Sequence, residues 1–276
     1  MKNLFVVLIF TQLALAEIAI MSGEEGTYSY SIGQELSKIN KTINIESKGH
    51  LENLIKLTKR YDILSIVPSD TLTYIHELFP RKMAKVRVVA KLPKIQVHLI
   101  VKKSSSINSL DDLIGKKINV GDDFESSNIF SSIFESNFDL RWKKMTYSTD
   151  VAFKYLLNAY KKLDAIILVG KAPMKVIEKN LSEIRFIELP IIGGYDYSSF
   201  ELKDKYEILE SRKTLEIPLL LLVNRGYHKN NELIIQSIFD ETKNIYNIDT
   251  CVQSSISESL NFEFTKKQFC NKRSIK

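Results

Sequence analysis

The sequence is poor in the residue types that build metal centres and covalent catalytic sites. Its four histidines are scattered, its two cysteines lie near the C-terminus, and neither set shows a metal-ligand spacing such as His-Glu-x-x-His. It also has no Gly-x-Ser-x-Gly or Ser-x-x-Lys segment, the patterns that surround an activated serine in several hydrolase families. These absences argue against a metalloenzyme and a serine hydrolase. We therefore expect no enzyme activity, no cofactor and no metal.

Charge of one sign is not concentrated anywhere along the chain. The formal net charge is +6, but short basic groups such as Lys102-Lys103, Lys116-Lys117 and Lys161-Lys162 alternate with acidic residues. Nucleic-acid binding favours a dense basic stripe with interleaved aromatic residues. We therefore expect a slightly basic, solvated surface and no nucleic-acid partner.

Long apolar runs are also missing, except for a short one at the start of the chain. Lys2 supplies a positive charge, an apolar stretch follows, and Ala14-Leu15-Ala16 fits the small-x-small pattern of a signal-peptidase site. No later run approaches the roughly 18 to 20 apolar residues that a membrane-spanning helix needs. We expect residues 1–16 to be a cleavable signal peptide and the mature protein to reside in the periplasm. A retained N-terminal anchor is the alternative.

The two cysteines, Cys251 and Cys270, stand close together in a polar segment. In an oxidising compartment an even pair is most simply a disulfide. It would close a loop of about 20 residues, which the chain-entropy model associates with roughly 3 kcal/mol of stabilisation. Two free thiols are the alternative.

Apolar strand-like segments alternate with helical patterns, which is typical of βα units and a parallel sheet. The expected strands are 18–21, 43–46, 63–67, 86–90, 96–101, 117–120, 165–169, 184–189 and 217–223. The expected helices are 31–39, 51–57, 71–78, 128–135, 150–160, 174–180 and 231–246. Leu92-Pro93 is a break after which the chain can enter a second lobe. We predict that residues 17–95 with 214–276 form lobe 1 and residues 96–213 form lobe 2.

Two α/β lobes joined by two crossings describe a clamshell with one shared cleft, since open α/β sheets bind ligands beyond the C-terminal ends of their strands. The loops expected at this cleft are 23–29, 47–50, 68–71, 121–128 and 170–173. In the first of them, Gly23 and Gly26 allow a sharp turn before a helix whose first N–H groups can hold an anionic or polar group. Polar residues in these loops can equally be helix caps.

Four sequence blocks in this order resemble one known family. Ser22–Tyr28 is similar to Thr-Gly-Gly-x-x-Gly-Thr-Tyr-Tyr, and Gly49–Asp70 to a block with Glu-Asn-Leu followed by a strand that ends in Asp. Asp112–Gly121 matches Asp-Leu-x-Gly-Lys-x-Val-x-Val-Gly, and Asp164–Pro173 matches a block that begins Asp-Ala and ends Gly-x-Pro. The chain thus resembles the TAXI family, the extracytoplasmic solute receptors associated with TRAP transporters.

The resemblance implies an α/β fold, a two-lobed clamshell of the type II periplasmic binding protein kind. It also implies a monomer that captures a small polar organic solute, of the amino acid or carboxylate type, and delivers it to the membrane permease subunits of a TRAP-type transporter. A periplasmic ligand sensor or signalling partner without a transport role is one alternative. A secreted enzyme that uses an isolated carboxylate, such as Glu52 or Asp70, is another.

The chain departs from the family at three places. Glu24 and Glu25 stand in the glycine-rich loop, Asp122-Asp123 follow Gly121, and His50 stands where a serine usually precedes the Glu-Asn pair. The added acids would repel a carboxylate unless they face solvent or are countered. We predict ligand contacts from residues able to hydrogen-bond, stack or pair with a carboxylate: Thr27, Tyr28, Asn53, Asp70, Ser126, Ser127 and Lys171. Glu24 and Glu25 would modulate the charge of the site.

Overall fold

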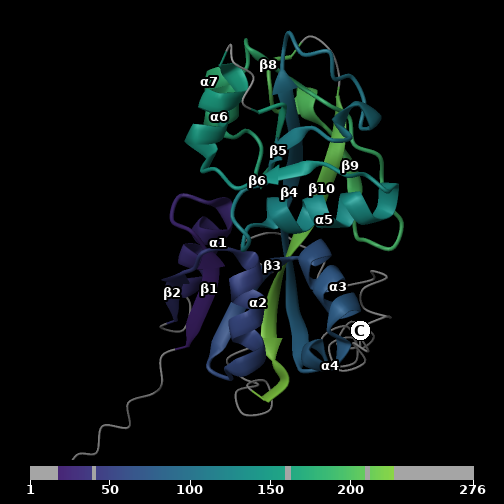
Figure 1. The fold of residues 1–276 in the computed structure, drawn as a ribbon. Coiled ribbons are helices and arrows are strands. Elements are labelled where there is room, and N and C mark those ends of the chain that lie inside the picture. The colour runs from purple at the N-terminus through teal and green to yellow at the C-terminus, as the bar shows by residue number, and fades with distance from the viewer. Residues whose placement is uncertain (1–17, 39–41, 159–162, 209–211, 227–276) are drawn as a thin grey trace, which may run out of the picture.

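The computed structural model describes residues 18–38, 42–158, 163–208 and 212–226 (Figure 1). The predicted signal peptide, the Cys251–Cys270 bond and the expected helix 231–246 lie outside the described residues. Within those residues, no helix is both long enough and apolar enough to cross a membrane.

The described chain forms two α/β halves, one above the other in Figure 1. The half that we call lobe 1 holds β1 (Ala19–Gly23), α1 (Tyr28–Ser37), β2 (Ile43–Glu46), α2 (His50–Lys59), β3 (Ile63–Pro68), α3 (Ser69–Leu78) and α4 (Pro80–Met83). The half that we call lobe 2 holds β5 (Lys117–Asn119), α5 (Ser126–Phe138), β6 (Lys143–Met145), α6 (Thr149–Leu157), β7 (Ala165–Gly170), α7 (Lys175–Asn180), β8 (Ile184–Phe186) and β9 (Ser198–Glu201). Short 3₁₀ turns, Asp111–Leu113 and Leu202–Asp204, complete it.

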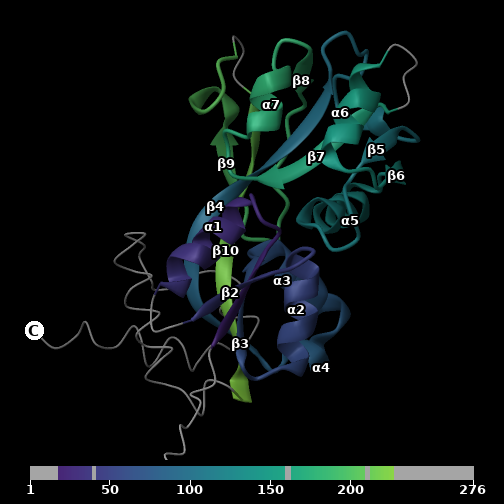
Figure 2. The ribbon, with the colours of Figure 1, turned by 90° about the vertical axis from the view of Figure 1, so that its left-hand side faces the viewer.

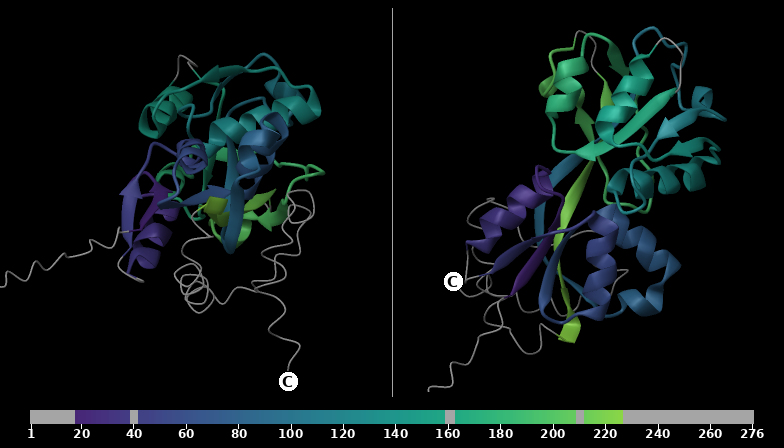
Figure 3. Two further views of the ribbon diagram at one scale, coloured as in Figure 1. Left: turned by 90° about the horizontal axis from the view of Figure 1, so that it is seen from below. Right: turned by 60° about the vertical axis from the view of Figure 1, so that its left-hand side comes forward.

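Two long strands connect the lobes. β4 (Val86–Lys102) leads from lobe 1 into lobe 2 and β10 (Lys213–Asn224) returns, as Figure 2 and the right panel of Figure 3 show. The expected break at Leu92-Pro93 is therefore wrong, because the strand runs on through it. These two residues lie instead in a register irregularity, where β10 pairs Pro218 with Lys94 and then Leu220 with Lys91. Such bulges are where a sheet accommodates proline.

The sheet is mixed, which corrects the prediction of a parallel sheet. One ten-stranded sheet has the order β2-β1-β3-β10-β4-β7-β5-β6, with β8 beside β4 and β9 beside β10. β1 is parallel to β2 and β3 in lobe 1, and β5 is parallel to β6 and β7 in lobe 2. β8 and β9 pair antiparallel with β4 and β10. β4 and β10 are antiparallel to each other and to β7 and β3 respectively. The reason is geometric: the chain leaves lobe 1 on one long strand and must come back along the other.

The apolar core is continuous between the lobes. Its largest cluster includes Ile20 and Leu64 from lobe 1, Phe130 and Ile167 from lobe 2, and Leu219 from the returning strand. Smaller clusters fill the far side of each lobe, under α2 and α3 in lobe 1 and under α6 and α7 in lobe 2. Apolar side chains from both lobes therefore pack against one another where the lobes meet.

Candidate functional site between the lobes

The starts of α2 and α5 meet directly where the two lobes touch. The backbone N–H of Leu51 donates to the carbonyl oxygen of Phe124 at 3.2 Å. Gly49 has φ +149°, and a side chain there would collide with that same carbonyl oxygen. Position 49 therefore requires glycine for two independent reasons. Its backbone conformation is one that other residues rarely adopt, and the opposite lobe approaches it too closely for a side chain.

His50 joins three helix starts through its ring. Its Nε2 atom lies 2.8 Å from Oγ of Ser29 on α1, and its Nδ1 atom lies 2.6 Å from Oγ of Ser126 on α5. Burial lowers the pKa of His50 to about 4, so the ring is neutral at pH 7 and can donate to one serine while it accepts from the other. Ser126 was a predicted contact, but His50 was noted only as a departure from the family pattern. That departure is the sequence feature that could have identified His50 as a residue of the junction.

Asp70 forms a second link between the lobes. Its carboxylate accepts from the backbone N–H of Thr71 at 2.6 Å and from the hydroxyl of Tyr197 at 3.1 Å. The Tyr197 ring packs edge-on against Phe130 of α5, with centroids 6.1 Å apart. Burial raises the pKa of Asp70 to about 6, and burial next to Asp70 also raises the pKa of Tyr197. Tyr197 was not predicted, since it lies in the polar stretch between residues 193 and 213.

Tyr28 and Lys171 face each other from opposite lobes. Lys171 Nζ lies 5.5 Å from the centroid of the Tyr28 ring, within the range of a cation–π contact, and donates to the carbonyl oxygen of Lys94 at 3.3 Å. Burial lowers the pKa of Lys171, with the charge of Lys205 acting in the same direction. Both residues were predicted contacts, and the structure brings them together. Lys171 therefore places a positive charge at this junction.

Other predicted contacts have local roles in the structure. Thr27 caps α1: its hydroxyl accepts from the N–H of Tyr30 at 3.3 Å and donates to the carbonyl oxygen of Glu24 at 2.7 Å. Ser127 is buried, and its hydroxyl donates to Glu125 at 3.3 Å. Thr27 thus agrees with the capping alternative, which the sequence left open for polar residues in these loops, whereas Ser127 does not cap α5.

Three buried polar atoms near the junction have no hydrogen-bond partner among the described residues. They are Oδ1 of Asn53, Oγ of Ser69 and Oγ of Ser47. Asn53 donates from its other amide atom to the carbonyl oxygen of Ile66 at 3.0 Å. Ser69 begins α3 and Ser47 precedes α2, so these atoms lie on segments that border the junction. An unsatisfied buried polar atom is unfavourable by about 1–3 kcal/mol, which makes these positions candidates for a bound polar group.

Two of the four added acids lie near the edge of the junction, because their charges, those of Glu24 and Asp122, add to the effect of burial in raising the pKa of Glu125 at the start of α5. Glu24, Glu25, Asp122 and Asp123 are all exposed to solvent. Their repulsion of an anionic group between the lobes is therefore screened by water. In the described part of the chain, no cluster of three His, Cys, Asp or Glu side chains could hold a metal ion.

Comparison with known proteins places this geometry in context. A family model described as the NMT1-like family matches residues 20–196. A search of curated proteins finds no match. MatC (Rpa3494) from Rhodopseudomonas palustris with bound malate has 11% identity and a TM-score of 0.53, with 82% of this chain and 84% of that chain covered.

Two further structures have similar scores. Rpa4515 from R. palustris with adipate is 12% identical with a TM-score of 0.53, covering 84% of each chain. The periplasmic aliphatic sulphonate binding protein SsuA from Escherichia coli is 15% identical with a TM-score of 0.51, covering 84% of this chain and 74% of that chain. The last of these is titled a periplasmic binding protein, and the other two were solved with malate and with adipate. The three structures confirm the predicted fold class, the two-lobed clamshell.

Proposed function

The chain belongs to the NMT1-like family, and from that membership we propose that it is an extracytoplasmic solute-binding protein that holds a small polar organic solute between its lobes. The TAXI resemblance adds the finer part of the proposal, delivery of the solute by a monomer to the permease subunits of a TRAP-type transporter. Export to the periplasm by residues 1–16 belongs to the same proposal.

The observation that carries the proposal is the hydrogen-bonded chain from Ser29 through His50 to Ser126. It brings the positive ends of three helix dipoles and two hydroxyl groups to one place, from both lobes. Only β4 and β10 connect the lobes within the described chain, so a hinge in these strands can open the junction. Polar groups presented from both sides of a hinged junction are what a clamshell receptor needs.

The charges favour an organic anion as the solute. Lys171 offers an ammonium group at the junction, while the added acids are exposed. Two structural neighbours were solved with malate and adipate, and a third is named for aliphatic sulphonates, all of them organic anions. We propose a small carboxylate held by Lys171 against Tyr28, with a hydrogen bond from the Ser126 hydroxyl, which the ring of His50 holds in place. Thr27, Asn53, Asp70 and Ser127 remain proposed contacts.

A thermal-shift screen of dicarboxylates, amino acids and sulphonates tests the proposal, because a ligand that binds only the folded state raises the melting temperature. Calorimetric titration of Lys171→Ala with the best ligand should then show a loss of affinity of about 10- to 100-fold. Lys175→Ala is the matched control, since Lys175 is an exposed lysine on nearby α7. If no compound shifts the melting temperature, or if Lys171→Ala binds the ligand like the parent, the proposal fails.

The role of the bound solute needs a separate experiment. Uptake into proteoliposomes that contain a TRAP-type permease should depend on this protein if it delivers the solute. Binding without any stimulation of uptake, together with a sensor kinase encoded nearby, would favour the signalling alternative instead.

A further inference from the structure

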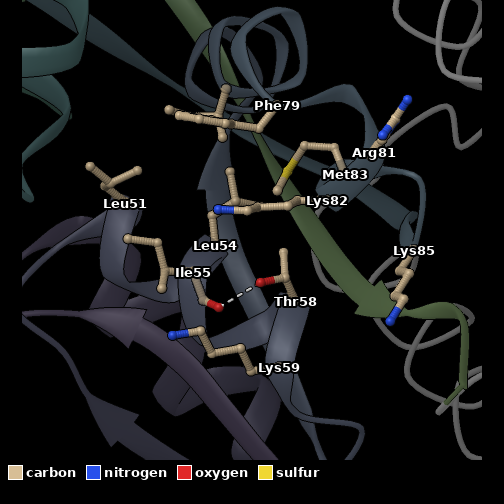
Figure 4. A pocket seen from close by; sticks show the side chains of 11 residues that line it. Leu51, Leu54, Ile55, Thr58, Lys59, Phe79, Arg81, Lys82, Met83 and Lys85 are labelled. Atoms are coloured by element: carbon tan, nitrogen blue, oxygen red, sulfur yellow. Dashed lines mark hydrogen bonds between the residues drawn. The ribbon is translucent and has the colours of Figure 1, made fainter.

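Lobe 1 contains a groove that the proposed function does not use. It runs between α2 on one side and the α3–α4 corner on the other (Figure 4) and encloses about 630 Å³. This volume lies within the range of about 300–1,000 Å³ that is typical of pockets for small molecules. The groove lies on a helical face of lobe 1, and the side chains of Ser29, His50, Asp70 and Lys171 do not line it. Leu51, whose backbone N–H donates to Phe124 of lobe 2, is the lining residue that also borders the junction.

The floor and walls of the groove are apolar. They are formed by Leu51, Leu54, Ile55, Ile75, Phe79 and Met83. The only hydroxyl that lines the groove, that of Thr58, donates to the carbonyl oxygen of Ile55 at 2.8 Å, the dashed line in Figure 4. Phe79 and Ile55 are 48% and 40% exposed, which is unusual for large apolar side chains beside a cavity. Among the residues that the structure describes, the apolar side chains of the groove therefore offer contact to a hydrocarbon.

All charged side chains that line the groove are positive. They are Lys59, Arg81, Lys82 and Lys85, and Figure 4 shows them around the apolar side chains. Among the residues that the structure describes, none of the four has an acidic group within ion-pair distance. Lys82 Nζ lies 5.0 Å from the centroid of the Phe79 ring, so one cation already sits over the apolar mouth. Unpaired cations around an apolar recess are complementary to a molecule with one acidic end and one hydrocarbon end.

We propose that this groove binds a single-chain anionic amphiphile, a long-chain carboxylate. Its hydrocarbon chain would lie along α2 against Leu54 and Ile55, and its carboxylate would pair with the cations of the α4 corner.

The geometry favours this occupant over a membrane surface or a partner helix. A membrane is bound by apolar side chains that project outward, whereas here they line a recess. A helix with its side chains is about 10–12 Å wide and carries its charges along its length. In this groove three of the four cations, Arg81, Lys82 and Lys85, come from the single segment at and after α4.

Calorimetric titration with dodecanoate below its micelle concentration tests the proposal on the full-length protein. We expect one site per chain. Octanoate should bind more weakly by a factor on the order of 100, because each buried methylene group contributes roughly fourfold. Dodecyl maltoside, which has the same chain and no charge, should bind at least about tenfold more weakly than dodecanoate.

Two variants locate the binding. The double variant Arg81→Glu/Lys82→Glu should lower the affinity for dodecanoate by at least about tenfold. The control is Lys175→Glu/Lys203→Glu, which makes the same charge change at two exposed lysines of lobe 2. Ile55→Glu should lower the affinity similarly, with exposed Ile191→Glu as its control. Circular dichroism verifies that each variant is folded.

The proposal is overturned if dodecanoate does not bind, or if it binds both groove variants like the parent. Binding to phosphatidylglycerol vesicles without binding of monomeric dodecanoate would also overturn it, in favour of a membrane surface. None of these outcomes depends on the solute between the lobes, because the variants leave Lys171 and His50 unchanged.

Discussion

The junction between the lobes and the interior of lobe 2 each contain a histidine, and the surroundings of the two rings differ. His50 lies at the junction, partly reaches the surface, and has a serine hydroxyl at each ring nitrogen. His98 lies on β4, is fully buried, and places Nε2 3.0 Å from the hydroxyl of Tyr206. The His98 ring also packs against Phe186 and Tyr206, with centroids 6.2 and 5.7 Å away. Burial lowers the pKa of both histidines to about 4.

The two sites differ in how a proton can be accommodated. A charged His98 can reach water only if the core of lobe 2 opens, since aromatic rings enclose it. A charged His50 can reach water when the lobes separate, while both lobes remain folded around β4 and β10. Similar pKa values therefore have different consequences: His98 affects the stability of the fold, and His50 affects the arrangement of the lobes.

Removing each ring is the strongest way to test this comparison. His98→Ala should lower the free energy of unfolding by about 3–4 kcal/mol, because it leaves a cavity among aromatic rings and removes the partner of the Tyr206 hydroxyl. His50→Ala should lower it by only about 1 kcal/mol, since water can enter the junction. Urea unfolding at pH 7 measures both changes. Equal losses in the two variants would mean that the junction is as tightly coupled to the fold as the core.

Acidification tests the same comparison through protonation. The pKa of His98 is about 4 in the folded chain and about 6.5 when unfolded, so protons favour the unfolded state. The stabilising contribution is complete above pH 6.5 and is lost as the pH falls toward 4. For His98 this loss is roughly 2–3 kcal/mol between pH 7 and pH 4.5.

Asp70 changes stability in the opposite direction over this range, so the difference between the two proteins is the test: on going from pH 7 to pH 4.5 the parent should lose roughly 2–3 kcal/mol more than His98→Gln, as urea unfolding at the two pH values measures. Small-angle scattering of the parent at pH 4.5 should show a larger radius of gyration than at pH 7, as His50 takes up a proton and the lobes separate. His50→Gln is the control that should not expand. Expansion of both proteins alike would remove His50 as the cause.

Asp70 lies at the junction too, but its protonation has the opposite sign. Its folded pKa of about 6 is above the unfolded value of 3.8, so folding favours the protonated form. The contribution of Asp70 to the free energy of unfolding is therefore greatest below pH 3.8. It falls as the pH rises to 6 and is constant above that. Asp70→Asn should therefore raise the free energy of unfolding by about 1–2 kcal/mol at pH 7 and by less at pH 4.5. A loss of stability at pH 7 would show that the ionised carboxylate is needed by Tyr197 and Thr71.

Local sequence patterns were sufficient for most of the elements that surround the junction. The strand expected at 43–46 is β2, and the helix expected from residue 71 is α3, which begins at Ser69. β6 and β9 were not predicted, because Lys143–Met145 and Ser198–Glu201 are short and have no apolar alternation. Their strand conformation depends on pairing with β5 and β10, whose paired residues lie 26 and 12 to 18 positions away in the sequence.

The junction itself could be predicted only in part. Helix-start patterns pointed to Asp70 and Ser126, but their partners Tyr197 and His50 are 127 and 76 residues away in the sequence. No periodicity or capping rule encodes such a pairing, because it depends on how the closed lobes are oriented. The contact of Lys171 with Tyr28 was implied only by placing both residues at the same cleft.

The smallest expected effect concerns the acids at the edge of the junction. Glu24 and Glu25 are exposed, so water and salt screen their charges from an anion between the lobes. The double variant Glu24→Gln/Glu25→Gln should raise the affinity for a small carboxylate by about twofold at low salt, and by nothing measurable at about 0.5 M salt. Glu125→Gln is the comparison, since burial raises the pKa of Glu125 and its carboxylate contacts Ser127.

The effect of Glu125→Gln on the affinity for the carboxylate should persist at high salt, because salt screens the charge of a partly buried group less. Calorimetric titration at two salt concentrations measures both effects. A salt-independent gain of tenfold or more in the double variant would mean that the two exposed acids turn toward the solute when it binds. In that case the region around α1, and not Lys171 alone, would set the charge that the junction accepts.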